Sequence, residues 1–597
     1  MKTLKKLLYL LTSKEQKKMG FLFVMILLMA LLDVLGIASI MPFIAVLSNP
    51  DIIETNQILS SAFGYSEIFG IKTKQQFFYF LGIIILILLV FSLTFKALTL
   101  YAQFRFTQMR EYSIGKRLIE GYLHQPYSWF LNRHSADLGK TILSEVSTVV
   151  SSGISPMVTL IANSIVAIVL LTLLILINPK LAIIAGFTLS LAYALIYKLV
   201  RTFLSRIGKE SVKADSARFT AVSEAFGASK EIKLGGFESI YTERFALPAQ
   251  KFAYNQAFAK ITSQLPRYAL EAVAFCGLLL VMLNLLADSG NLNTVIPVIA
   301  LYVFAGYRLM PALQQIYISF TLLRFVGPAL DNLYNDLEKL DKEPQIANKD
   351  TFSFNDQITL REINYNYPNS SQKVLKNINL SISAKQRIGI VGKTGSGKTT
   401  LVDIILGLLD PQNGIVKVDK IDINKNNQRM WQKSIGYVPQ KIFLSDDTIA
   451  ANIAFGTNAK NINYDKVVQA SKIANLHEFV TDELPSKYQT RIGERGVRLS
   501  GGQSQRIGIA RALYHEKNLL VLDEATSALD YQTEKAVMDA LKNISKKTTI
   551  IIIAHRLNTI KECDKIFFLD KGQIMGEGAY NNLIETNDFF KKFISVN

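Results

Sequence analysis

Cysteine and charge are both scarce in this chain. Only Cys276 and Cys563 occur among its 597 residues, and no cysteine and histidine cluster has the spacing of metal ligands. The composition therefore excludes a disulfide-stapled secreted scaffold and gives no support to a zinc site. Charged residues make up 19% of the chain. No basic run is dense enough to follow a phosphate backbone, so we expect no nucleic-acid partner.

Apolar residues are abundant instead. They make up 49% of the chain, and the mean hydropathy of +0.23 is too high for an ordinary soluble enzyme of this length. Several apolar runs are long enough to cross a bilayer core of roughly 30 Å, and none follows after about residue 330. A soluble core cannot bury six such helices. The sequence predicts membrane-spanning helices at about 21–48, 77–100, 158–177, 181–200, 269–287 and 295–323.

The basic residues of this half indicate its orientation. The stretches that would lie outside hold only Lys72, Lys74 and Lys180, whereas the opposite stretches are rich in lysine and arginine. The positive-inside rule then places both termini in the cytoplasm. Residues 1–20 alternate lysine with leucine and tyrosine, and the apolar run behind them is too long for a signal peptide. They predict a helix lying along the inner membrane surface.

The pattern changes after a polar linker. Short β-branched runs now alternate with glycine-rich turns and helical stretches, and residues 388–391, 519–522 and 549–554 indicate buried parallel strands of an α/β domain. The predicted division is an interfacial helix at 1–20, a six-helix transmembrane domain at 21–337, a linker at 338–353 and a nucleotide-binding domain at 354–597.

A complete phosphate-binding loop follows the first of these strands. Its glycines allow backbone N–H groups to turn toward phosphate oxygens, and the following helix adds its positive end. Lys398 is expected to reach the β- and γ-phosphates of ATP, and the Thr399 hydroxyl to bind Mg²⁺. The expected nucleotide contacts here are Gly392, Lys393, Thr394, Gly395, Ser396, Gly397, Lys398, Thr399 and Thr400.

Two adjacent carboxylates end the strand at 519–522. Asp523 is expected to hold Mg²⁺, and Glu524 to polarise the attacking water. An exposed acidic pair at a strand end is the alternative, which the phosphate-binding loop upstream makes remote.

The segment Leu499-Ser500-Gly501-Gly502-Gln503 resembles the signature of the ATP-binding cassette (ABC) family, and the resemblance covers essentially the whole chain. It implies an α-helical transmembrane domain of exporter type fused to an α/β P-loop domain. The resemblance assigns adenine stacking to Tyr367, and both Mg²⁺ binding and catalysis to Gln440. It identifies residues 494–496 as the X-loop and residues 527–530, which include Asp530, as the D-loop. It assigns the γ-phosphate switch to His555, and a second phosphate contact to Ser500, Gly501, Gly502 and Gln503.

One signature and one phosphate-binding loop imply a dimer. In the ABC family ATP lies between the loop of one domain and the signature of another, which one chain cannot close around a single nucleotide. All catalytic positions match the family pattern, which favours a two-fold homodimer over a heterodimer. Residues 124–130 and 230–244 resemble the loops that couple ATP hydrolysis to the membrane helices; solvated interhelical turns are the alternative.

Three cations within the expected membrane segments suggest the cargo. They are Lys96, Arg267 and Arg308, and they fall between the middle of the membrane and its inner edge. Charged side chains there are costly and usually have a functional role. Snorkelling to headgroups is the alternative. Facing a cavity, they suit an anionic group such as pyrophosphate. Asp33 and Glu271 are the few acidic residues that accompany them.

The segments 266–271 and 307–311 resemble bacterial lipid-linked oligosaccharide flippases of protein-glycosylation systems, as does the opening of the first helix through 41–43. The resemblance implies a polyprenyl-pyrophosphate oligosaccharide carried from the cytoplasmic to the periplasmic leaflet of the bacterial inner membrane. The external segment 52–74 is either a helix touching lipid tails or a plain loop.

Other functions stay open at this point. Within transporters, the alternative is a general lipid, multidrug or peptide exporter. Two alternatives are not transporters. One is a membrane-tethered P-loop kinase or nucleic-acid ATPase, which the signature argues against. The other is an ATP-gated channel.

Overall fold

The computed structural model describes residues 2–596 except 49, 67, 69, 178, 269–270, 273–274, 277–278, 280–291, 342–351, 353, 369, 371, 494–495 and 555. The chain divides into two compact units. The first contains Met1–Gln125 and Arg133–Pro344, and the second contains Pro126–Asn132 and Gln345–Asn597. The short segment Pro126–Asn132, inside the predicted transmembrane domain by sequence, thus belongs to the nucleotide-binding unit.

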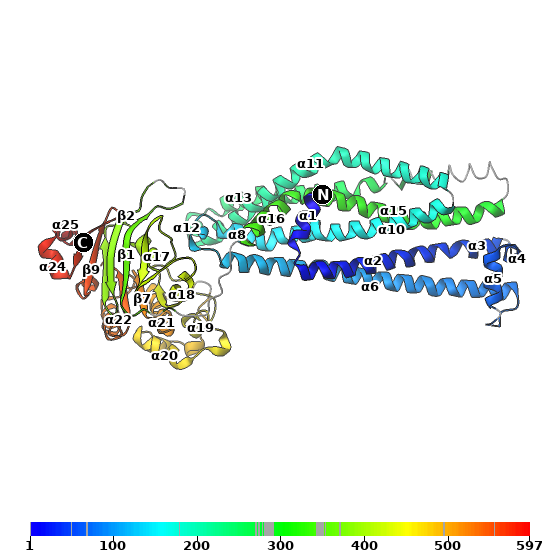
Figure 1. The fold of residues 1–597 in the computed structure, drawn as a ribbon. Coiled ribbons are helices and arrows are strands. Elements are labelled where there is room, and N and C mark those ends of the chain that lie inside the picture. Colours follow the sequence, from blue (N-terminus) through cyan, green and yellow to red (C-terminus); the bar gives the residue numbers. More distant parts are fainter. Residues whose placement is uncertain are drawn as a thin grey trace. The chain divides into compact units, whose positions relative to one another are not determined.

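Long helices build the first unit, and they lie side by side (Figure 1). The described residues include four helices long and apolar enough to span a membrane, or five if the bent pair α15 and α16 counts as one span. Most of the predicted span 269–287 falls outside the described residues. The principal helices are α2 (Ser13–Ala38), α3 (Ile40–Ser48), α6 (Lys74–Leu123), α10 (Ser155–Ile177), α11 (Pro179–Gly227), α13 (Glu238–Gln264), α15 (Leu292–Phe325) and α16 (Gly327–Asp341).

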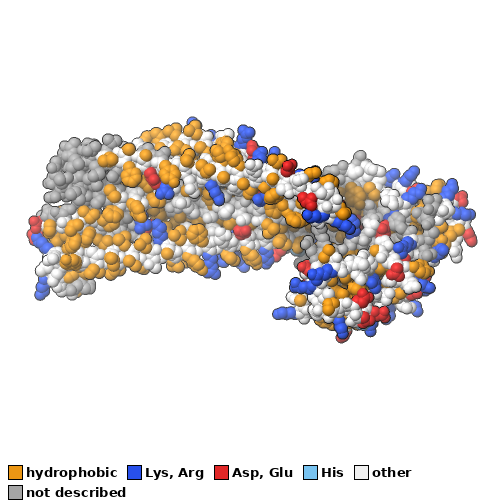
Figure 2. Space-filling model, turned by 180° about the vertical axis from the view of Figure 1, so that it is seen from behind, with side chains coloured by type: hydrophobic (Ala, Val, Ile, Leu, Met, Phe, Trp, Pro, Cys, Tyr) orange, Lys and Arg blue, Asp and Glu red, His pale blue; other side chains and the backbone are white. Residues whose placement is uncertain are grey.

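Two of these helices are much longer than a bilayer requires. At about 1.5 Å per residue, α6 with its 50 residues and α11 with its 49 residues extend for more than 70 Å. A capping box formed by Thr73 and Gln76 fixes the start of α6. Hydrophobic side chains cover the flank of this unit, as lipid contact requires, whereas charged side chains are spread over the nucleotide-binding unit (Figure 2).

Short elements complete the first unit. The N-terminal helix α1 (Lys2–Leu10) buries Leu7 and Leu10 completely, and its Lys6 forms an ion pair with Asp331 of α16. Part of its apolar side is therefore covered by the chain itself, while Leu4 and Tyr9 stay exposed. Other short elements are α8 (Ser135–Lys140), α9 (Val146–Val149), α12 (Ser229–Gly235), and π-helical turns at Thr141–Glu145 and Val150–Ile154.

The external segment is helical over most of its described length. It forms α4 (Ile52–Thr55) and α5 (Gln57–Ser66), which are anchored to the start of α6 by the edge-to-face contact of Phe63 with Phe77. Of its apolar side chains, Tyr65 and Ile68 are exposed. Of the two alternatives for residues 52–74, a helix or a plain loop, the structure contains the helical one.

The nucleotide-binding unit has two sheets. The larger has the order β10-β9-β3-β8-β7-β6, and all its neighbouring strands are parallel except β10 and β9. The three predicted strands are confirmed as neighbours at its centre. Its strands are β3 (Arg387–Gly392), β6 (Ile435–Val438), β7 (Leu519–Asp523), β8 (Thr549–Ile553), β9 (Lys565–Asp570) and β10 (Gln573–Gly578).

Side chains of the central strands alternate between two cores. Leu520 and Leu522 point into the cluster on one face, whereas Leu519 and Val521 point into the cluster on the other. Because both faces are covered, the strands read as continuous apolar runs. Parallel pairing also brings the carboxyl ends of β3 and β7 to one edge of the sheet, where the nucleotide motifs begin.

A smaller antiparallel sheet has the order β2-β1-β4-β5. The helices of this unit include α7 (Tyr127–Phe130), which is contributed from Pro126–Asn132. The remaining elements are β1 (Gln357–Tyr365), β2 (Leu375–Ser383), β4 (Asn413–Val418), β5 (Ile421–Asp422), α17 (Lys398–Ile405), α18 (Gln428–Lys433), α19 (Ile449–Ile453), α20 (Tyr464–Ile473), α21 (Gly501–Tyr514), α22 (Tyr531–Ile544), α23 (Leu557–Lys561), α24 (Tyr580–Thr586) and α25 (Asp588–Val596), with short turns at Ala459–Asn461, Phe479–Glu483 and Lys487–Gln489.

Candidate functional sites

The phosphate-binding loop connects β3 to α17. Gly392, Gly395 and Gly397 have φ values of 155°, 78° and 101°, which side chains other than glycine rarely adopt. A Cβ atom at Gly392 would collide with the carbonyl oxygen of Leu569 on the neighbouring strand β9. The loop therefore needs glycine both for its turn and for its close approach to the sheet.

Lys398 begins α17 and is buried. Its Nζ donates to the carbonyl oxygens of Gly392 at 2.8 Å and Lys393 at 3.1 Å. Burial lowers the pKa of this ammonium group, while the carboxylates of Glu524 and Asp523 act in the opposite direction. The buried hydroxyl of Ser396 has no hydrogen-bond partner within the described residues. A lysine and an orphaned hydroxyl inside a glycine loop fit the oxygens of a nucleotide phosphate.

The acidic pair stands at the end of β7. Asp523 is buried, and its Oδ2 accepts a long hydrogen bond of 3.5 Å from the Tyr437 hydroxyl. Glu524 takes a left-handed conformation with φ of 50°, and its Oε2 accepts a hydrogen bond of 2.7 Å from Nε2 of Gln440. The structure therefore brings together two of the predicted catalytic residues from positions 84 apart in the sequence.

The residues for Mg²⁺ supply the right chemistry. The expected ligands are the hydroxyl of Thr399, the amide oxygen of Gln440 and the carboxylate of Asp523, and Mg²⁺ prefers such oxygens over nitrogen and sulfur. Within the described part of the chain, no group of three or more His, Cys, Asp and Glu residues could hold another kind of metal ion. Bound there, Mg²⁺ would neutralise charge on the phosphates.

Sequence reasoning missed the acid Asp403. It lies on α17 and is partly buried, and burial together with the negative charge of Asp523 raises its pKa to about 6. Nothing in the sequence around Asp403 marks it as unusual, because only the fold brings α17 against the end of β7.

The predicted adenine-stacking residue lies beside the phosphate-binding loop. Tyr367 follows β1, and its hydroxyl lies 3.0 Å from Oγ1 of Thr400, within hydrogen-bond distance. Its ring packs edge-to-face on Tyr365, with the ring centroids 5.3 Å apart. The small antiparallel sheet thus delivers one aromatic ring to the start of α17.

The signature segment starts helix α21. Ser500 and Gln503 form a capping box, in which Oγ of Ser500 accepts from the N–H of Gln503 and Oε1 of Gln503 accepts from the N–H of Ser500. Gly501 and Gly502 leave room for the D-loop, since a Cβ atom at Gly502 would lie 3.1 Å from the carbonyl oxygen of Ala528. The start of this 14-residue helix is suited to an anion.

Gln505 is a second residue that the sequence did not reveal. Its Nε2 donates to Oγ of Ser527 at 2.9 Å and to the carbonyl oxygen of Glu524 at 3.4 Å. Its Oε1 accepts from the N–H of Ala528 at 2.9 Å. Asp530 then caps α22 by accepting from the N–H of Thr533. One buried amide therefore joins the signature helix, the catalytic strand end and the D-loop.

Three residues of the expected motifs lie outside the described residues. They are Glu494 and Arg495 of the X-loop and the switch residue His555.

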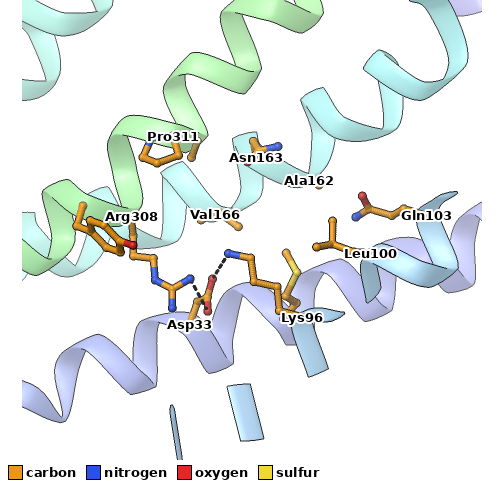
Figure 3. A pocket seen from close by; sticks show the side chains of 12 residues that line it. Asp33, Lys96, Leu100, Gln103, Ala162, Asn163, Val166, Arg308 and Pro311 are labelled. Carbon is orange, nitrogen blue, oxygen red and sulfur yellow. Dashed lines mark ion pairs between the residues drawn. The ribbon is translucent and has the colours of Figure 1, made fainter. Parts of the chain in front are cut away.

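A cavity of about 300 Å³ lies within the membrane unit, between α2, α6, α10 and α15. Lys96 and Arg308 line it, and both face the same carboxylate: Nζ of Lys96 and Nη1 of Arg308 each lie 3.6 Å from an oxygen of Asp33 (Figure 3). The other lining residues are Met29, Leu100, Gln103, Ala162, Asn163, Val166, Tyr307, Pro311 and Ala312.

Arg267 is placed differently. Its Nε forms an ion pair of 2.6 Å with Glu271 one turn further along the chain, and its side chain is half exposed. Arg267 is absent from the described lining of the cavity. Of the three predicted cations, the structure joins two.

Comparisons with known proteins agree with both sites. Residues 375–527 match the family described as ABC transporter, and residues 15–315 match the ABC transporter transmembrane region. An ATP-dependent lipid A-core flippase of Burkholderia thailandensis is 29% identical over 476 residues, which cover 79% of each chain. An export ATP-binding/permease protein of Rickettsia bellii is 31% identical over 446 residues, 72% of this chain and 74% of that one.

A solved structure also matches the fold. The structure of a bacterial Atm1-family ABC exporter with ATP bound covers 97% of this chain and 98% of its own, with a TM-score of 0.78 and 21% sequence identity.

Proposed function

This chain belongs to the ABC transporter family, as a multi-pass exporter that couples ATP hydrolysis to transport, and we propose that its cargo is a lipid-linked oligosaccharide. The oligosaccharide is joined to a polyprenyl tail through pyrophosphate. The protein moves it from the cytoplasmic to the outer leaflet of a bacterial inner membrane, with both termini in the cytoplasm.

The observation that carries this proposal is the pair of cations at one cavity among the membrane helices. Lys96 and Arg308 come from α6 and α15, and their side chains are 34% and 21% exposed. Charge inside a membrane segment is costly and is usually kept for function. A guanidinium and an ammonium group on one cavity wall suit the oxygens of a phosphate or pyrophosphate.

The relatives support a lipid cargo of this general kind. Several of them are named lipid A-core flippases, from Burkholderia, Cupriavidus and Pseudomonas. A cavity for cationic drugs would instead expose acidic groups, whereas Asp33 is the acidic residue of this lining and its side chain is only 2% exposed. A general lipid exporter is the second candidate, favoured by the same names.

A homodimer completes the nucleotide sites. The phosphate-binding loop follows β3 and the signature starts α21, and in this family each ATP lies between the loop of one copy and the signature of the other. Lys398 and Ser396 would bind phosphate, and Thr399, Asp523 and Gln440 would hold Mg²⁺. Glu524 would orient the attacking water and accept its proton. The hydrogen bond from Gln440 keeps the Glu524 carboxylate directed at this site.

Helix α7 supports coupling between hydrolysis and transport. Pro126–Asn132 belongs to the compact unit of the nucleotide-binding domain. Burial and the nearby charge of Asp403 raise the pKa of the Tyr127 hydroxyl. Near α12, Leu234 and Phe237 remain exposed in the single chain. We assign both segments to coupling, with the second one contacting the partner copy.

Reconstitution in sealed proteoliposomes tests the proposal. The substrate is a fluorescent polyprenyl-pyrophosphate oligosaccharide, and a labelled phosphatidylethanolamine serves as control. The wild-type protein should translocate the glycolipid with ATP and Mg²⁺, whereas Glu524→Gln should bind ATP without translocation. Arg308→Ala should lower glycolipid transport at least tenfold while basal ATPase activity persists.

The variants separate the two candidates. Equal transport of both lipids by the wild-type protein would favour the general lipid exporter. Undiminished glycolipid transport by Lys96→Ala/Arg308→Ala would contradict the role of the cationic cavity.

A further inference from the structure

The carboxylate of Asp33 lies between the two cations of the cavity. Asp33 projects from α2, and its Oδ1 accepts a hydrogen bond of 3.0 Å from Oγ of Ser92 on α6. Oδ1 also lies 3.6 Å from Nη1 of Arg308, and Oδ2 lies 3.6 Å from Nζ of Lys96. Figure 3 shows Arg308 and Lys96 approaching this carboxylate from its two sides. One carboxylate on α2 thus pairs with two cations, one on α6 and one on α15.

The cations are more accessible than the acid between them. The side chains of Lys96 and Arg308 are 34% and 21% exposed, whereas that of Asp33 is 2% exposed. Both ion-pair distances exceed the range of 2.7–3.2 Å for a good N–H···O hydrogen bond. Asp33 therefore attracts the cations through space and leaves their N–H groups able to turn toward an anion in the cavity.

We propose that Asp33 is a specificity-determining residue that makes the cavity reject singly charged phosphodiester headgroups in favour of pyrophosphate. This inference rests on the proposed function and deepens it. Two cations and one carboxylate leave a single net positive charge. An incoming anion is attracted by both cations but repelled by Asp33, so a weak anion gains little. Such a repulsive element is a common source of specificity.

A pyrophosphate diester overcomes this repulsion because of its length. Its two linked phosphorus atoms hold two negative charges apart, so one phosphate can lie beside Lys96 and the other beside Arg308, each away from the carboxylate between the cations. A phosphodiester has one charge on one phosphorus atom and competes poorly with a carboxylate already placed between the cations. The distinction matters because anionic phospholipids of the membrane surround the protein in large excess.

Lipid binding to the full-length dimer in nanodiscs of neutral phosphatidylcholine tests this inference. The two probes are a polyprenyl-pyrophosphate-linked N-acetylglucosamine and phosphatidylglycerol, each titrated against a fluorescent polyprenyl-pyrophosphate probe. The wild-type protein should prefer the pyrophosphate lipid. Asp33→Asn removes the charge with little change in size, and should bind phosphatidylglycerol about tenfold more tightly and lose most of the preference.

Matched variants give the control. Asn163→Ala alters the lining of the same cavity without changing its charge, and should keep the wild-type ratio of the two affinities. Asp33→Ser removes the same charge with a smaller side chain and serves if Asp33→Asn does not assemble. An unchanged ratio in the Asp33 variants, or an equal loss of affinity for both lipids, would overturn the role of Asp33.

The outcomes distinguish this inference from the proposed function. If the wild-type protein has no affinity for the pyrophosphate lipid but Asp33→Asn gains affinity for phosphatidylglycerol, the proposed cargo is wrong and the counter-ion role stands. Inorganic pyrophosphate separates a headgroup from a free anion. Its displacement of the fluorescent probe at equal concentration would overturn the assignment of a lipid ligand.

Discussion

Single residues at the sheet edge owe their properties to neighbours that are distant in the sequence. Asp403 acquires a pKa of about 6 because the fold buries its carboxyl group and α17 carries it toward Asp523. Glu524 accepts a hydrogen bond from Gln440. In the membrane unit, Asp33 meets Lys96 and Arg308. A sequence indicates that such residues exist, but their meeting depends on the rotation of each helix about its axis, which periodicity does not fix.

Replacing Asp403 should change stability in a pH-dependent way. Its folded pKa of about 6 lies above the ordinary value of 3.8. Ionised Asp403 therefore costs stability, and this cost develops as the pH rises from about 4 to 6. Asp403→Asn should raise the apparent Tm at pH 8. At pH 5 the corresponding gain in the free energy of unfolding should be about half as large. Thermal unfolding of the protein in nanodiscs without ATP and Mg²⁺ measures it.

A gain in Tm that is equal at both pH values would contradict the shifted pKa of Asp403. Asp410→Asn, at an exposed acid shortly after α17, provides the control.

At the scale of elements, regular patterns could be predicted and irregular ones could not. The strands at 388–391, 519–522 and 549–554 were recognisable because both of their faces are buried. Strand β1 was not, since Glu362 has a positive φ and the register shifts between Leu360 and Ile363. That irregularity breaks the alternation by which a half-buried strand is recognised.

The junction between α21 and the D-loop depends on Gln505. Gln505→Ala removes three hydrogen bonds to Ser527, Ala528 and Glu524. We expect kcat for ATP hydrolysis to fall about tenfold, which corresponds to roughly 1.4 kcal/mol, because the D-loop is no longer held beside Glu524. The KM for ATP should change little. Steady-state ATPase measurements give both constants.

The exposed Gln532 on α22 supplies a matched control, and Gln532→Ala should leave turnover unchanged. A rise in KM with an unchanged kcat in Gln505→Ala would instead indicate that this residue acts only in nucleotide binding.

For the whole molecule, the division into membrane helices and an α/β domain followed from the positions of the long apolar runs and of the short β-branched runs along the sequence. Six membrane spans were predicted; the described residues contain four helices that could span a membrane, or five with the bent pair, and most of the remaining predicted span at 269–287 lies outside the described residues. The sequence singled out residues 124–130 only through their resemblance to coupling loops, and Pro126–Asn132 belongs to the nucleotide-binding unit. Aromatic residues occur in many amphipathic turns, so those of this segment do not by themselves identify the surface that they contact.

Mixed dimers test the whole assembly. Lys398→Ala damages the phosphate-binding loop and Ser500→Arg damages the signature, so each variant alone should lose ATPase activity. A dimer with one chain of each kind has one composite site with both defects and one with neither. Random co-assembly should therefore restore about a quarter of the wild-type activity. Inactivity of a purified mixed dimer would contradict independent sites shared between two chains.

Helix α6 has a mechanical consequence. It runs without a break from Lys74 to Leu123, and Lys96 lies about 33 Å from its first residue and about 40 Å from its last. A stiff helix that pivots near its middle moves its two ends in opposite directions by nearly equal distances. Lys96, which we propose contacts the cargo, lies near this middle and would move least.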